Sequence, residues 1–140
     1  MTAFDLERFV TAQEEVFSRA LIELKEGYKR SHWMWFVFPQ IAGLGHSPMA
    51  RFYAIASAAE ARAYLAHPLL GPRLAACTGA MLAHKGRSAE TILGPVDALK
   101  FRSSLTLFEA AADDPTLFAE ALDAFCDGER DERTLALVHA

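Results

Sequence analysis

The chain has 140 residues, of which 52% are apolar, and its formal net charge is −4. A chain of this length and composition suits one hydrophobic core, so we expect residues 1–140 to form a single domain. Acidic and basic residues are interspersed along the chain, without the concentrated positive charge that selects polyanions. We therefore expect no nucleic-acid partner and no membrane partner.

Two further sequence features point to an intracellular protein. Charged Glu7 and Arg8 follow the first residues directly, in place of a signal peptide, and no later stretch approaches the roughly 18 apolar residues that span a bilayer. Cys77 and Cys126 lie in apolar patterns without a C-x-x-C spacing, which predicts two buried thiols. A cytoplasmic location without disulfides is the expectation.

The first half of the chain shows helical patterns with clear start and stop signals. Apolar residues recur at helical spacing from Leu6 to Leu24, with Asp5 as the expected N-cap and Gly27 as the stop, which predicts one long amphipathic helix. Ser47 before Pro48 predicts the start of a short helix, and residues 57–60 form a capping box that opens another.

Prolines and glycines divide the second half into further helices. The expected segments, each begun by a proline, cover 72–86, 95–108 and 115–128, with a short turn from Ser88 to Ile92 and a last one over 134–138. The charged run 128–133 predicts an exposed connection. The fold class expected from the whole pattern is all-α, a mainly helical and compact multi-helix domain.

The segment Ser31–Gln40 does not show one clear periodicity. Its six consecutive apolar residues, Trp33–Phe38, fit one short extended segment as well as a turn of helix. A stretch that is apolar on all sides must be buried on all sides, and two tryptophans bury roughly 300 to 500 Å². We expect this segment at the centre of the core.

Several of these segments together resemble a known family. The strings Ser31–Gln40, 43–45 (GLG), His67-Pro68 with Gly71, and 103–108 (SSLTLF) are similar to the bacterial domain-of-unknown-function family numbered eighteen-ten, over nearly the whole chain. The resemblance implies a mainly α-helical single domain and no established activity or catalytic residue. Some members carry the label "calpastatin-like", but calpain inhibitors of that kind are disordered when free, and a chain this apolar should fold by itself.

One candidate site is the glycine-bearing loop with Gly43, Gly45, His46 and Ser47, which leads into the helix carrying Arg51. Free N–H groups at a helix start attract anions, and Arg51 or His46 can complete a phosphate or carboxylate clamp. Alternatively, the glycines only turn the chain and Ser47 only caps the helix, because a full phosphate-loop signature is absent.

A second candidate is a set of polar residues among apolar ones. Lys100, Ser103 and Ser104 share helical spacing and form a polar wall, which we expect to face His32, Gln40 and Lys29 near the tryptophans. Trp33 or Trp35 would then stack on a ligand, and His32 would be the general acid or base, with Lys100 or Ser103 positioning the substrate. Alternatively, these groups satisfy caps and chain turns.

Other chemistries find little support in the sequence. The chain has no H-E-x-x-H or paired C-x-x-C motif, so we expect no metal site and no cofactor. Two functions remain: binding of a small anionic or nucleotide-like ligand, with or without catalysis, and a non-catalytic interaction or regulatory module. The second would use an exposed patch of Phe52, Tyr53 and Tyr64. The sequence carries no signal for an oligomeric state.

Overall fold

Ten helices make up the regular structure of residues 4–139, which are the residues that the computed structural model describes, and no strand occurs among them. The all-α prediction is confirmed. The helices are α1 Glu7–Gln13, α2 Phe17–Glu26, α3 Met34–Val37, α4 Pro48–Phe52, α5 Ala58–Ala66, α6 Leu70–Leu82, α7 Ala89–Leu93, α8 Pro95–Ala111, α9 Thr116–Cys126 and α10 Glu132–Val138.

The serine caps predicted from the sequence at Ser47 and Ser57 are present, and Ser88 forms a third cap. The hydroxyls of Ser47, Ser57 and Ser88 each accept a hydrogen bond from the backbone N–H three residues further on, at 3.1, 3.2 and 3.1 Å. Each bond satisfies a donor that the first turn of a helix leaves free. These local signals fix where α4, α5 and α7 begin.

The predicted single helix from Leu6 to Glu26 is wrong, because the chain breaks at Glu14–Val16 and forms α1 and α2. Asp5 does not cap α1, whose N-cap position is Leu6. The break lets the two helices follow different partners, since α1 packs against α3 and α2 packs against α6. Gly27 ends α2 in a left-handed conformation (φ +79°), as expected.

The apolar segment Trp33–Phe38 contains one helical turn, α3, and not the extended alternative. The Phe38 N–H donates to the Met34 carbonyl at 3.1 Å. A buried extended segment needs a neighbouring strand for its N–H and C=O groups, and residues 4–139 hold only isolated bridges. A turn of helix satisfies part of its own backbone, which explains this choice.

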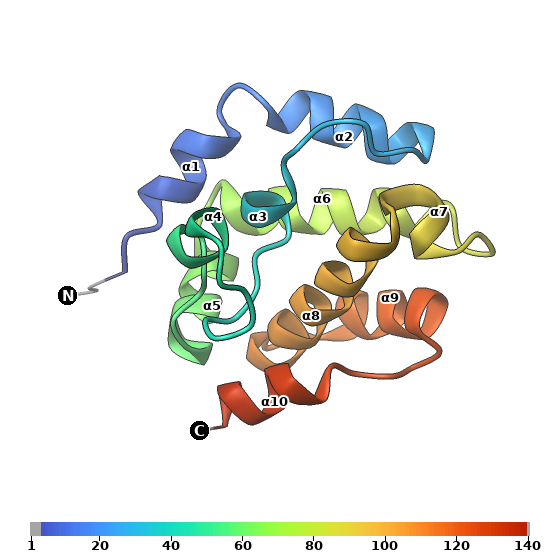
Figure 1. Ribbon diagram of the computed structural model, residues 1–140. Helices are drawn as coiled ribbons and strands as arrows, with labels where there is room; N and C mark the ends of the chain where they lie inside the picture. The colour runs from blue at the N-terminus through green and yellow to red at the C-terminus, as the bar shows by residue number, and fades with distance from the viewer. Residues whose placement is uncertain (1–3, 140) are drawn as a thin grey trace.

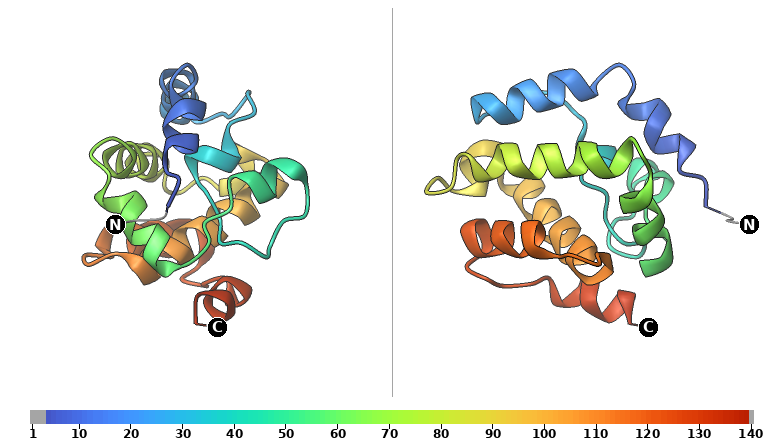
Figure 2. Two further views of the ribbon diagram at one scale, coloured as in Figure 1. Left: turned by 90° about the vertical axis from the view of Figure 1, so that its left-hand side faces the viewer. Right: turned by 180° about the vertical axis from the view of Figure 1, so that it is seen from behind.

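Helices α6 and α8 form the centre of the molecule (Figures 1 and 2). α6 contacts α2, α5 and α9, and α8 contacts α5, α7, α9 and α10. The core contains six large aromatic side chains that are fully buried, and these are Phe9, Trp33, Phe38, Tyr64, Phe101 and Phe108. Within residues 4–139, none of the helices combines the length and the apolar character that crossing a bilayer requires.

Candidate functional site

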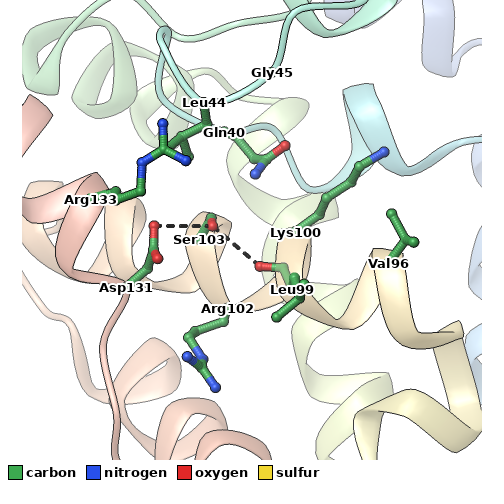
Figure 3. Close-up of a pocket in the computed structure, with 10 residues that line it drawn as sticks. All are labelled: Gln40, Leu44, Gly45, Val96, Leu99, Lys100, Arg102, Ser103, Asp131 and Arg133. Carbon is green, nitrogen blue, oxygen red and sulfur yellow. Dashed lines mark hydrogen bonds between the residues drawn. The ribbon is translucent and has the colours of Figure 1, made fainter.

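A pocket of about 340 Å³ lies where the loop before α4 meets α8 and the start of α10 (Figure 3). It joins segments that are far apart in the sequence. The lining residues are Gln40, Leu44 and Gly45 from the loop, Val96, Leu99, Lys100, Arg102 and Ser103 from α8, and Asp131 and Arg133 near the start of α10. Gln40, Gly45, Lys100 and Ser103 belong to the site residues expected from the sequence.

The loop that carries Gln40 is held by a short bridge to Ile55. The Ile55 N–H donates to the Gln40 carbonyl and the Ala42 N–H donates to the Ile55 carbonyl, both at 2.8 Å. Ile41 and Ile55 are buried there. Because side chains alternate along extended backbone, burying Ile41 turns the Gln40 amide the other way, toward the middle of the pocket (Figure 3).

Steric constraints explain why two positions of the loop, 43 and 45, are glycine. Gly43 adopts φ +106°, which L side chains rarely adopt, and a Cβ there would lie 3.3 Å from the Leu137 side chain. At Gly45 a Cβ would lie 2.6 Å from the Ala50 Cβ. The loop therefore passes too close to α4 and α10 for larger residues.

Asp131 joins α8 to α10 at the edge of the pocket. Its carboxylate accepts hydrogen bonds from the Thr134 N–H at 3.1 Å, from the Thr134 hydroxyl, and from Ser103 Oγ at 3.2 Å. Its own N–H donates to Thr106 Oγ1 at 3.0 Å. The Asp131 carboxylate is therefore occupied by caps and anchors, and it does not form an ion pair with a pocket cation in the described part of the chain.

The pocket gathers more positive charge than its carboxylates balance. Arg133 forms no ion pair within residues 4–139, and Lys100 shares Asp97 with Lys29. The Arg102 guanidinium points away from Gln40 and Ser103 (Figure 3) and adds little charge to the pocket. The Lys29 ammonium is 2.8 Å from Asp97, whereas that of Lys100 is 3.7 Å away. Lys29 is therefore the main partner of this carboxylate, and Lys100 is only partly neutralised. An anion in the pocket would meet unbalanced positive charge.

Arg51 and Gly43 line a second, smaller hollow of about 190 Å³ on the other side of the same loop. Gln40 and Gly45 line both spaces. Ser47 lines neither, and its hydroxyl accepts the Ala50 N–H as the cap of α4. The residues of the glycine-bearing loop and Arg51 therefore do not all line one hollow.

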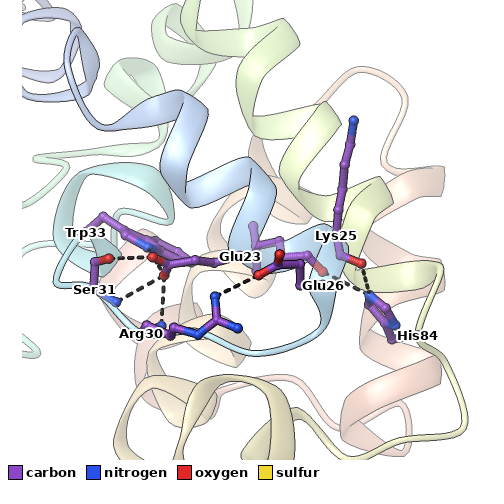
Figure 4. Close-up of polar contacts among 8 residues, drawn as sticks. Glu23, Lys25, Glu26, Arg30, Ser31, Trp33 and His84 are labelled. Atoms are coloured by element: carbon purple, nitrogen blue, oxygen red, sulfur yellow. Dashed lines mark hydrogen bonds and ion pairs between the residues drawn. The ribbon is translucent and has the colours of Figure 1, made fainter.

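Trp33 does not line the pocket, since it is buried at 1% exposure and its indole N–H donates to the Glu23 carboxylate at 3.0 Å (Figure 4). Glu23 also accepts from the Arg30 and Ser31 N–H groups and from the Ser31 hydroxyl. Burial alone raises the pKa of Glu23, but these four hydrogen bonds outweigh it and lower the pKa to about 2. This network fixes the chain between α2 and α3.

The other predicted residues of the polar wall lie apart. His32 is exposed and does not line the pocket. Trp35 is half-buried beneath the Lys100 ammonium, which is 5.1 Å from its ring centre. Ser104 is buried in the core at 1% exposure, and its hydroxyl has no hydrogen-bond partner within residues 4–139. Of the wall on α8, only Lys100 and Ser103 reach the pocket.

Neither the cysteines nor the expected apolar patch forms an alternative site. Burial raises the pKa of the Cys77 thiol to about 12, and His84 instead contacts the Leu24 and Lys25 carbonyls. Tyr64 is fully buried and Tyr53 is half-buried, so the predicted exposed patch with Phe52 is wrong.

Residues 4–139 hold no group of three or more potential metal-ligating side chains placed around one point.

The sequence reasoning missed the contribution of the charged run 128–133, which it assigned to an exposed connection. That run supplies Asp131 and Arg133 to the pocket, and Arg130 anchors it through two hydrogen bonds to the Glu109 carboxylate. Asp131 followed by Thr134 is an N-cap pattern that predicts the start of α10. It gives no indication of the long-range contact with α8.

The comparisons with known proteins agree with this all-α architecture. The chain belongs to the family described as "Protein of unknown function (DUF1810)", whose model matches residues 3–138. Among solved structures, it is similar to the conserved hypothetical protein Rv1873 from Mycobacterium tuberculosis, with 52% sequence identity over 99% of each chain and a TM-score of 0.97. Among curated proteins, no significant match was found.

Proposed function

We propose that the protein binds a small anionic ligand in the pocket between the Gln40–Gly45 loop, α8 and the start of α10. The observation that carries this proposal is the charge of the lining. Arg133 has no carboxylate partner in the described chain and Lys100 shares Asp97 with Lys29, although the formal net charge of the whole chain is −4. Arg133 is exposed, so water solvates its guanidinium in the free protein, and an anion in the pocket can replace that water.

Polar groups suited to orienting such a ligand lie between the cations. The Gln40 amide lies between the Arg133 guanidinium and Lys100 in Figure 3, above Ser103. An amide and a hydroxyl fix the orientation of a ligand, while guanidinium groups bind carboxylate or phosphate oxygens with two parallel bonds. A volume of about 340 Å³ lies near the lower end of ordinary ligand sites, which favours a metabolite-sized anion.

A titration tests this proposal with simple anions. Inorganic phosphate and acetate are added to the ¹⁵N-labelled protein at low ionic strength, and amide shifts are followed by NMR. We expect saturable shifts at 40–45, 96–103 and 131–133. Arg133→Gln should weaken binding about tenfold, because a charged hydrogen-bonding partner is lost.

The matched control is Arg19→Gln, since Arg19 is an exposed arginine of α2 that does not line the pocket. It changes the net charge of the chain by the same amount as Arg133→Gln. If the two variants weaken anion binding equally, the effect is due to net charge alone and the proposed site is wrong. Absence of saturable shifts with either anion also contradicts the proposal.

A further inference from the structure

Two apolar side chains beside the pocket are unusually exposed. Val96 and Leu99 are 64% and 63% exposed, the highest fractions among the large apolar residues exposed in the described chain. They lie three residues apart on α8, and so share one face of that helix. Both line the pocket, together with half-buried Leu44.

This exposure contrasts with the rest of α8, which is the central helix of the fold. Its residues Phe101, Leu105 and Phe108 are at most 1% exposed. A single exposed apolar residue is ordinary on a protein surface, but apolar residues that gather beside unbalanced cations form a surface of mixed chemistry. Such a surface fits a ligand that is itself both charged and apolar.

Val96 and Leu99 lie at the end of the pocket away from Arg133, on the side of Lys100, whereas Leu44 lies beside Arg133 (Figure 3). Ser103 and Gln40 lie between these two ends. An anionic group held by Arg133 therefore leaves the remainder of the ligand directed along Leu99 and Val96. The volume of about 340 Å³ limits that remainder to one ring or a short chain.

From this arrangement we infer that the ligand is a small organic anion with an apolar body, such as an aromatic or short aliphatic carboxylate. The inference rests on the proposed function, because it assigns the anionic group to the same cations. Its new content is the role of Val96 and Leu99, which bury the apolar body and so discriminate between anions of equal charge.

The test compares probes that differ in one property at a time. Acetate, butanoate and hexanoate share a carboxylate and differ in chain length, while hexanol has the chain length of hexanoate without its charge. Dissociation constants are measured by NMR titration at constant ionic strength. Affinity should rise roughly two- to fourfold for each methylene that becomes buried, and hexanol should bind more weakly than hexanoate.

Variants of Val96 and Leu99 test whether these residues cause the preference for longer carboxylates. Leu99→Ser and Val96→Ser should reduce the preference for hexanoate over acetate roughly three- to tenfold, since they remove the apolar contact. The readout is the ratio of the hexanoate affinity to the acetate affinity in each variant. Ile22→Ser is the matched control, because Ile22 is an apolar residue of α2 with 55% exposure that does not line the pocket.

The outcomes separate this inference from the proposed function. If phosphate binds and the carboxylates show no chain-length preference, the inference of an apolar ligand body is wrong, but the proposed anion site is retained. Equal binding of hexanol and hexanoate overturns both. Absence of binding by phosphate and all carboxylates also overturns both. Self-association of the protein that Leu99→Ser abolishes, without a carboxylate effect, assigns the surface to a second copy of the chain and overturns the inference.

Discussion

The network around Glu23 and the pocket around Arg133 use charged groups in opposite ways. The Glu23 carboxylate accepts four hydrogen bonds from the loop that follows α2 and from Trp33. The Arg133 guanidinium forms no hydrogen bond or ion pair with the described residues. One charge is saturated by the protein itself, and the other is exposed to solvent.

This difference separates structural from functional polar groups better than residue type does. Buried polar groups are normally hydrogen-bonded, so a saturated carboxylate such as that of Glu23 needs no ligand to explain it. An exposed cation without a partner in the protein contributes little to stability, so replacing Arg133 should cost little. The three predictions below test whether the two regions differ in this way.

The largest effect is expected for Glu23→Ala, which removes the acceptor of four hydrogen bonds. The Trp33 indole N–H then stays buried without a partner, and the loop at Arg30 and Ser31 loses its anchor. We expect the free energy of unfolding to fall by about 3 kcal/mol. Urea denaturation followed by tryptophan fluorescence measures it.

The control for this variant is Glu26→Ala on the same helix. Glu26 forms an ion pair with Arg30 at 2.7 Å, but both side chains are about half exposed. Its loss should cost less than about 0.5 kcal/mol. Similar losses in both variants would mean that the Glu23 network does not hold this region together.

A smaller effect is expected from acid. The folded state lowers the pKa of Glu23 from 4.5 to about 2, so its contribution to stability is fully present above the unfolded value and is lost as the pH falls toward 2. A shift of this size corresponds to at most about 3 kcal/mol, and we expect a loss of about 2 kcal/mol by about pH 3, where the titration of Glu23 is still incomplete.

The measurement is a set of urea denaturation curves between about pH 6 and about pH 3 for the wild type and for Glu23→Gln. The glutamine cannot ionise, so the difference between the two proteins isolates the titration of Glu23. That difference should shrink as the pH falls. A difference that stays constant over this interval would contradict the pKa assigned to the carboxylate.

Local signals in the sequence were sufficient for most helices. Serine caps and first-turn prolines act over three or four residues, so the starts of α4, α5, α7 and α8 could be predicted. The break at Glu14–Val16 could not, because it depends on α1 packing against α3 and α2 against α6. Tertiary contacts therefore break the chain between α1 and α2, although the apolar periodicity of the sequence continues through this segment.

The pocket could be predicted only in part, for the same reason. Gln40, Gly45, Lys100 and Ser103 carry local signals, namely polar residues among apolar ones and glycines in a loop. Arg133 and Leu99 become site residues only when α10 packs on α8 and the loop is bridged to Ile55. Conversely, Trp33 looked like a stacking surface, and its burial against Glu23 is visible only in three dimensions.

The smallest effect on stability is expected for Arg133→Gln. Because its guanidinium contacts no carboxylate in the described chain, replacing it should change the free energy of unfolding by less than about 0.5 kcal/mol, and the loss of repulsion from Lys100 favours a slight gain. Urea denaturation without added anions measures this change. Repeating it with saturating phosphate should stabilise the wild type more than the variant, because only a ligand that binds the folded state adds to stability. A large loss of stability without anions would show that Arg133 is part of the framework, as Glu23 is, and would remove the contrast between the two regions.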